Sequence, residues 1–141
     1  MIHYYNEDCD FVPGKKVHLN DWIKSIIAHE NRKPGEINFI FCSDAHLITI
    51  NNQYLNHDDY TDIITFDYSE SKKVSGDIFI SIDRIKENAE KFSVSFLDEL
   101  HRVMIHGVLH LCGYKDKKPE EKKLMTQKEN ESLEKRNEHL N

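Results

Sequence analysis

Residues 106–116 read His-Gly-Val-Leu-His-Leu-Cys-Gly-Tyr-Lys-Asp, a pattern that predicts a helix ending in a sharp turn. His106 and His110 are four residues apart, a spacing that places side chains about 6 Å apart on one helix face. Gly113 is the residue type that most readily ends a helix with a left-handed turn. The chain can then fold back and bring Asp116 toward the histidines. The pattern predicts three ligands for one metal ion with an open position, as in catalytic zinc sites.

The residues before this turn support a helix with one apolar face. Apolar residues recur at helical spacing from Phe96 to Cys112, and the two histidines lie on the shoulder of this apolar arc. A half-buried position suits metal ligands, but it also suits two ordinary hydrogen-bonded histidines, so the spacing alone leaves both interpretations open. Cys112 points away from the histidines and is predicted to be a small buried hydrophobic residue.

The rest of the chain predicts elements in the order β-α-β-α-β-β-α-α-α. We expect strands at residues 2–6, 37–41, 63–68 and 77–82, and helices from an Asn20 cap, at 44–54, at 83–92, from a Ser95 cap and from Pro119. The strands at 63–68 and 77–82 should form an antiparallel hairpin. The fold class is therefore α+β with a small mixed sheet surrounded by helices, and residues 1–141 form one domain.

Three local patterns complete this prediction. Lys33-Pro34-Gly35 is a strong turn signal, which should stop the first helix. The tail from Lys128 is almost entirely polar and is expected to fray. The loop at residues 56–60 holds His57, Asp58 and Asp59, which allow a second metal site, although turn chemistry explains them better.

Composition restricts the class of protein. The chain has no run of 18 apolar residues and no signal-peptide pattern at its start, so we expect no membrane segment. Cys9, Cys42 and Cys112 are widely spaced and odd in number, which fits a reducing cytoplasm.

The charge pattern is mixed. The formal net charge of −6 opposes non-specific binding to nucleic acid, but a local basic cluster can still position a phosphate. Arg102 lies one helical turn before His106, and Lys115 and Lys117 flank Asp116. We take these three cations as candidate RNA-binding residues, whereas the lysines at 122 and 123 suit a solvated helix face.

Three ordered motifs resemble the YbeY family of metal-dependent endoribonucleases. The stretch at 106–116 is similar to the family signature His-Gly-x-Leu-His-Leu-x-Gly-Tyr-Asp-His. Residues 60–66 (Tyr-Thr-Asp-Ile-Ile-Thr-Phe) are similar to its Pro-Thr-Asp-Val-Leu-Ser-Phe segment, and residues 76–81 are similar to its Gly-Asp-Ile strand. The likeness extends from about Glu36 to Met125.

This resemblance implies a fold and a function. It implies a small mixed sheet with a zincin-like metal-binding helix, and a single-strand-specific endoribonuclease that acts in ribosomal RNA processing, including maturation of the 16S rRNA 3′ end. The implied cofactor is one zinc ion held by His106, His110 and Asp116. The implied partners are ribosomal RNA and the ribosome or its small subunit, in the cytoplasm, with neither DNA nor a membrane.

The sequence departs from the family at two positions. Asp116 stands where relatives usually have a third histidine, and a carboxylate is a harder ligand that favours manganese or another divalent ion more than histidine does. Leu55 stands where relatives tend to have an arginine. If that arginine holds phosphate in relatives, this chain must use another cation.

Two rival functions remain open at this point. The offsets of the histidines and Asp116 also match metzincin proteases, but those enzymes carry a glutamate as general base after the first histidine, where this chain has Gly107. The other rival is a non-catalytic ribosome assembly factor in which the ion only stabilises the turn. The acidic net charge and Leu55 favour that rival to some extent.

Overall fold

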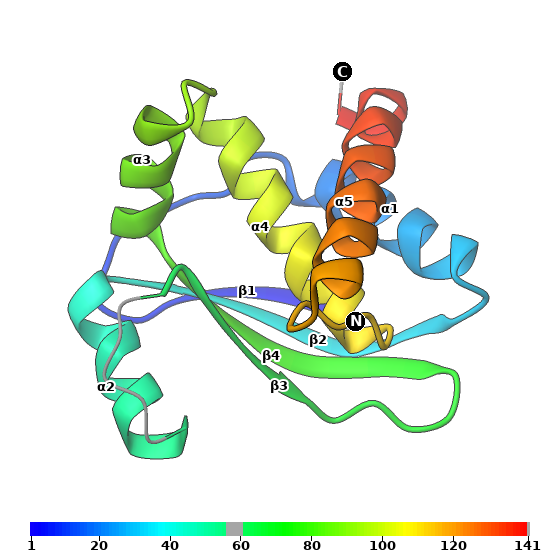
Figure 1. Ribbon diagram of the computed structural model, residues 1–141, viewed down its shortest axis with the longest axis horizontal. Coiled ribbons are helices and arrows are strands. Elements are labelled where there is room, and N and C mark those ends of the chain that lie inside the picture. The colour runs from blue at the N-terminus through cyan, green and yellow to red at the C-terminus, as the bar shows by residue number, and fades with distance from the viewer. Residues whose placement is uncertain (56–60, 141) are drawn as a thin grey trace.

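The computed structural model describes residues 1–55 and 61–140, and these residues contain every element of the predicted order (Figure 1). In chain order the elements are β1 (Ile2–Asn6), α1 (Lys16–His29), β2 (Lys33–Cys42), α2 (Asp44–Leu55), β3 (Ile63–Asp67), β4 (Lys73–Ser81), α3 (Ile82–Lys91), α4 (Phe96–Leu111) and α5 (Pro119–Leu140). The predicted α+β class is confirmed.

The described strands form one mixed sheet in the order β1-β2-β4-β3. β1 and β4 run parallel to β2 on either side of it, and β3 runs antiparallel to β4. The predicted hairpin is therefore present, with Ile64 opposite Phe79. The arrangement leaves β3 at the edge of the sheet, beside α4.

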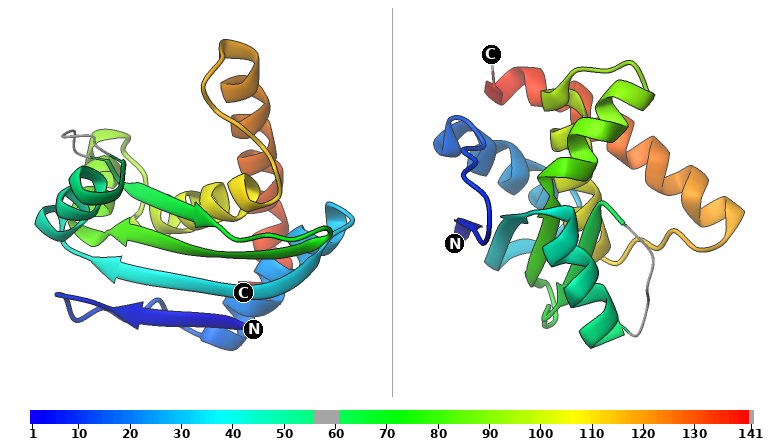
Figure 2. Two further views of the ribbon diagram at one scale, coloured as in Figure 1. Left: turned by 90° about the horizontal axis from the view of Figure 1, so that it is seen from below. Right: turned by 90° about the vertical axis from the view of Figure 1, so that its left-hand side faces the viewer.

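Helices cover the two faces of the sheet unequally (Figure 2). α1 and α4 pack on one face, where the main core contains the fully buried Phe39 and Ile78. α2 packs on the other face, over a smaller cluster that includes Leu47 and Ile64. Side chains of a strand alternate between faces, which explains how neighbouring residues such as Ile78 and Phe79 enter different clusters.

The start and the end of α4 follow from its sequence. The Ser95 hydroxyl accepts a hydrogen bond from the Asp98 backbone N–H at 3.0 Å, which caps the helix as predicted. At the other end, Gly113 adopts a φ of 108°, and its N–H donates to the His110 carbonyl at 2.9 Å. A residue with a Cβ is strained at this φ, so glycine is what allows the chain to reverse here.

Two predicted features near α1 are wrong. Asn20 lies inside α1, which begins at Lys16, and its side-chain oxygen accepts a hydrogen bond from the Tyr4 hydroxyl at 2.8 Å. The turn after α1 is made by Asn31, with a φ of 60°, instead of Lys33-Pro34-Gly35. Residues 33–35 open β2, where an irregularity in pairing follows Pro34. Proline is tolerated near the start of a strand and at such bulges.

The strand that was expected at residues 77–82 begins earlier, at Lys73, and stops one residue before its expected end. It ends at Ser81, whose hydroxyl accepts a hydrogen bond from the Arg84 N–H at 3.1 Å. This cap begins α3 at Ile82. Ile82 is therefore helical, although the alternation of apolar residues along β4 predicted that it would continue the strand.

The tail expected to fray from Lys128 is instead part of a long packed helix. α5 continues to Leu140, and Glu129 and Ser132 are buried. The indole N–H of Trp22 in α1 donates to the Ser132 carbonyl at 2.8 Å, and Arg136 pairs with Asp98 of α4 at 2.8 Å. Tertiary contacts with α1 and α4 therefore hold a segment that its composition alone would leave free.

Three further expectations concern membrane segments, the cysteines, and residues 55–60. Among the described helices, none combines the length and apolar character that a membrane crossing requires. The three cysteines are free, and Cys112 is buried as predicted. His57, Asp58 and Asp59 lie outside the described residues, as does the side chain of Leu55 at the end of α2.

Candidate metal centre

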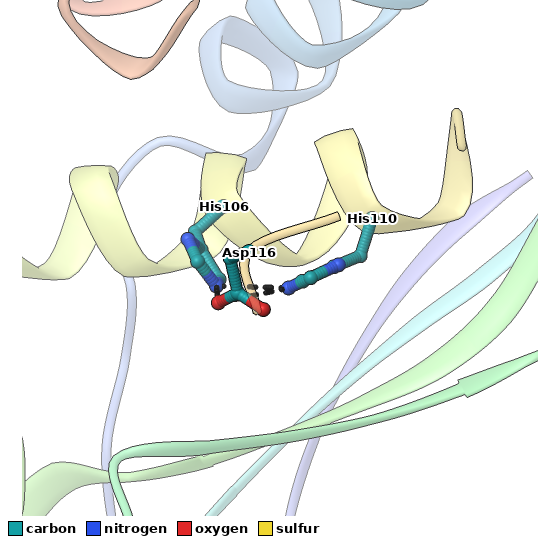
Figure 3. A group of neighbouring side chains, drawn as sticks. All are labelled: His106, His110 and Asp116. Carbon is teal, nitrogen blue, oxygen red and sulfur yellow. Dashed lines mark hydrogen bonds and ion pairs between the residues drawn. The ribbon is translucent and has the colours of Figure 1, made fainter. Parts of the chain in front are cut away.

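α4 places His106 and His110 on the same face, one helical turn apart. Their ring centroids are 4.6 Å apart, and the two Nε2 atoms approach to 3.0 Å. Each ring therefore points the same nitrogen at a common point beside the helix (Figure 3).

The other ring nitrogens have partners that fix the hydrogens. His106 Nδ1 lies 2.6 Å from Glu129 Oε2 of α5, and His110 Nδ1 lies 2.9 Å from the Tyr114 carbonyl oxygen. A carboxylate and a carbonyl accept hydrogen bonds, so each Nδ1 carries the hydrogen in a neutral ring. Each Nε2 then presents a lone pair. Partners of this kind orient most histidine ligands of metals.

The chain reversal at Gly113 brings Asp116 to the same point. Asp116 Oδ2 lies 3.3 Å from His106 Nε2 and 3.5 Å from His110 Nε2. The three ligand atoms all lie within 4.8 Å of one another. The sequence prediction that these three side chains converge agrees with the structure (Figure 3).

These three atoms fit a divalent cation. Two imidazole lone pairs and a carboxylate oxygen face one another, which is unfavourable unless a positive charge lies among them. Ligand atoms about 2.0–2.2 Å from a tetrahedral zinc ion are separated by about 3.3–3.5 Å, close to the separations of 3.0, 3.3 and 3.5 Å seen here. The described residues therefore form a donor set that could hold one ion.

A cleft of about 960 Å³ opens over this centre. It lies between the edge strand β3, the face of α4 that carries the histidines, the loop at residues 113–117 and Glu129 of α5. Its lining includes the three predicted RNA-binding cations Arg102, Lys115 and Lys117. Lys115 and Lys117 are exposed, whereas Arg102 is engaged by Glu129 at 2.9 Å. The centre is thus reachable from solvent, with cations at its rim.

Negative charge gathers on the inner side of the cleft. Burial raises the pKa of Asp62 above its ordinary value. Burial, with the nearby Asp62, also raises the pKa of Glu99. For His106, burial alone would lower the pKa, but the Glu129 hydrogen bond and the Asp116 and Asp62 charges outweigh it and raise the pKa. The field in the cleft therefore favours a cation at the histidines.

Sequence reasoning missed four contributors to this site. Asp62, Glu99 and Glu129 line the cleft, and Tyr114 supplies the carbonyl that orients His110. Glu99 was detectable, since it lies seven residues before His106 on the same helix face. No pattern in the sequence indicated Glu129, because it lies in a segment whose composition is almost entirely polar.

Comparisons with known proteins agree with this description. The family model for endoribonuclease YbeY matches residues 3–137. The endoribonuclease YbeY of Parabacteroides distasonis is 50% identical over 132 residues, which are 94% of this chain and 93% of the relative. That of Flavobacterium psychrophilum is 53% identical over 129 residues, or 92% of each chain. A solution structure of a Thermotoga maritima protein is similar with a TM-score of 0.67 and 29% identity, over 96% of this chain and 89% of that one.

Proposed function

Because the chain belongs to the YbeY family of endoribonucleases, we propose that it is a zinc-dependent endoribonuclease that cleaves single-stranded ribosomal RNA. His106, His110 and Asp116 hold the ion in this proposal, and the substrate phosphate enters the cleft beside them. Association with the ribosome or its small subunit, maturation of the 16S rRNA 3′ end, and a cytoplasmic location belong to the same proposal.

One observation carries the proposal. The hydrogens on both Nδ1 atoms are committed to Glu129 and Tyr114, so both Nε2 lone pairs and one Asp116 oxygen point at one place. Three protein ligands and an open cleft are the arrangement of a catalytic metal site, whereas structural sites are closed by a fourth protein ligand.

The residues of the cleft suit phosphodiester hydrolysis. The chemistry that a zinc ion supplies when bound is polarisation of the phosphate and acidification of water toward a pKa of about 7. In this proposal Lys115 and Lys117, which line the cleft, hold the phosphate. Asp62 lines the same cleft with a raised pKa, which suits a group that takes up the proton of the attacking water.

The structure weighs against a protease. The position of a metzincin general base is occupied by Gly107, and a Cβ there would lie only 2.9 Å from Ile78 Cγ2 and 3.0 Å from Ile63 Cδ1. Position 107 therefore faces the packed sheet. A glutamate there would neither fit nor reach the cleft.

Single-turnover cleavage of a single-stranded RNA tests the proposal. We compare wild type, His110→Ala, chelator-treated protein and His29→Ala, in which an exposed histidine at the end of α1 is removed as a control. Wild type and His29→Ala should cleave alike, and the other two should lose at least about a hundredfold in rate. Zinc should restore only the chelated protein, and a duplex should resist cleavage.

Two results would contradict this proposal. Equal cleavage by all four proteins would show that the metal centre is not used. No cleavage by any of them, together with unchanged binding to ribosomal subunits, would indicate the non-catalytic assembly factor instead.

A further inference from the structure

We propose that a basic surface outside the cleft, made of Arg32, Lys33, Lys72 and Lys73 and named here the hairpin patch, binds the backbone of the RNA beyond the cleaved phosphate. This inference rests on the proposed function, and it adds the path that the RNA strand follows once it leaves the cleft.

Backbone pairing brings the four residues together. Lys33 and Lys73 are register partners in β2 and β4, strands that lie about 4.8 Å apart. The Lys33 N–H donates to the Lys72 carbonyl at 2.9 Å, and the Arg32 guanidinium donates to the Ser71 carbonyl at 3.3 Å. Residues some 40 positions apart in sequence thus form one cluster of cations, at the end of the molecule where the β3–β4 connection turns (Figure 1).

The charges of this patch are not neutralised nearby. Lys33, Lys72 and Lys73 are exposed, and none of the four residues forms an ion pair with another described residue. Glu70 lies in the same turn, and Glu30, two residues before Arg32, is paired with Lys128 at 3.8 Å, so three positive charges remain in excess. In a chain with a net charge of −6, such an excess is a local feature. This local excess of positive charge attracts phosphate, although the net negative charge of the whole chain repels it.

The patch is continuous with the metal centre. Tyr114, whose carbonyl orients His110, donates its hydroxyl to Glu30 at 2.7 Å, and Glu30 is two residues before Arg32. Arg32 Nη2 also lies 3.6 Å from the place that a Cβ would take at Gly113. Lys115 and Lys117, two and four residues after Gly113, line the cleft. An extended RNA strand can therefore pass from the cleft over Gly113 to the hairpin patch.

The chemistry of the patch favours phosphate over bases. Its members are three lysines and one arginine, without an aromatic side chain on which a base could stack. Lysines act as point charges toward phosphate and carry no sequence information. The patch should therefore strengthen binding of long RNA of any sequence. It should leave the chemical step unchanged.

Two RNAs of different length separate an effect on RNA binding from an effect on the chemical step. One is a short oligonucleotide that fills only the cleft, and the other is a long unstructured RNA. The test variant is Lys33→Gln/Lys72→Gln/Lys73→Gln; Arg32 is kept because it also bonds to Ser71. The control is Lys24→Gln/Lys86→Gln/Lys91→Gln, which removes the same charge from exposed positions on α1 and α3.

We expect the test variant to cleave the short RNA like wild type and to raise KM for the long RNA at least about tenfold at moderate salt. We also expect a weaker salt dependence for the long RNA. In a plot of the logarithm of the RNA association constant against the logarithm of salt concentration, each neutralised phosphate of a single strand contributes about 0.7 to the slope, so loss of three lysines should reduce the slope by about 2. The control variant should stay within about twofold of wild type.

Each other result has one meaning. If wild type cleaves both RNAs and the two triple variants behave alike on the long one, the hairpin patch does not hold RNA and the inference is overturned. The proposed function then stands. If wild type cleaves neither RNA, the proposed function and this inference fall together.

Discussion

Glu129 illustrates how a residue remote in sequence can determine the chemistry of the centre. Its carboxylate is buried and lies 2.6 Å from His106 Nδ1. It also accepts a hydrogen bond from the Arg102 guanidinium at 2.9 Å. The Arg102 guanidinium donates to Glu129 Oε1, and Glu129 Oε2 accepts the hydrogen of His106 Nδ1. His106 Nε2 is thereby left free to bind the ion.

Replacing Glu129 by glutamine should weaken zinc binding about 10- to 100-fold, because a neutral amide raises the basicity of the ring less than a carboxylate does and can present its NH2 group, which disfavours the tautomer with the hydrogen on Nδ1. Competition with a chromophoric chelator measures this. Glu131→Gln removes a carboxylate two residues away, on the exposed side of α5, and should leave the affinity unchanged. Equal affinities in the two variants would mean that Glu129 does not position His106.

At this scale the sequence predicted that the three candidate ligands meet, but it missed the residues that orient them. His106, His110 and Asp116 lie within eleven residues of one another, so helical periodicity and one glycine suffice to predict their meeting. The contact between His106 and Glu129 depends on how α5 packs against α4, which no local pattern encodes.

At the scale of elements, Gly107 controls how closely α4 approaches the sheet. A Cβ at this position would lie 2.9 Å from Ile78 Cγ2, shorter than ordinary contact. The missing side chain lets the helix lie close to β3 and β4, which holds the histidines over the edge of the sheet.

Gly107→Ala should therefore destabilise the protein by about 1–2 kcal/mol. Overpacking costs about 1–3 kcal/mol, and the better helix propensity of alanine returns up to about 1 kcal/mol. Urea unfolding measures the difference. Gly14→Ala is a poor control because of its φ of 103°, so Lys123→Ala on the exposed face of α5 serves instead. A stabilised Gly107→Ala protein would contradict the close packing.

The packing of α5 on α4 should also make stability depend on pH. His101 is 7% exposed, and its ring lies 5.7 Å from the tilted Trp22 ring of α1. It accepts a hydrogen bond from Arg136 of α5 at 3.0 Å, and Arg136 also pairs with Asp98. Burial and Arg136 lower the pKa of His101 to about 4 from its usual 6.5, against the opposite effect of Asp98. In the folded protein this ring stays neutral where the unfolded chain is protonated.

The stabilisation from neutral His101 is complete above pH 6.5 and is lost as the pH falls toward 4, by about 3 kcal/mol at most. His101→Gln keeps an acceptor for Arg136 and cannot titrate. Between pH 6 and 4.5 the unfolding free energy of wild type should fall about 1.4 kcal/mol per pH unit more steeply than that of the variant. Parallel curves would show that His101 is not held neutral.

Element types were predictable because each is encoded locally, whereas their boundaries depend on partners. The Ser95 cap and Pro119 marked real helix starts. Asn20 was misassigned because its side chain bonds to Tyr4 across the fold instead of to its own backbone. The Pro34 signal failed because β2 has an irregularity there.

At the scale of the whole molecule, the fold makes one helix and one edge strand the walls of a cleft over the candidate metal centre. α4 supplies the two histidines, β3 forms the opposite wall, and α5 closes the inner side with Glu129. The sheet order β1-β2-β4-β3 and the packing of α5 create this arrangement. Neither follows from hydrophobic periodicity, because both are set by contacts between residues far apart in the chain.

The central claim is that a single ion held by His106, His110 and Asp116 makes this chain a nuclease. The most direct measurement is the rate of single-stranded RNA cleavage as zinc is returned to metal-free protein, with bound zinc counted at each step. The rate should rise in proportion to bound zinc and level off at one ion per chain, and Asp116→Ala should bind far less zinc and remain inactive. Full cleavage without metal, or unchanged zinc content in Asp116→Ala, would contradict the account.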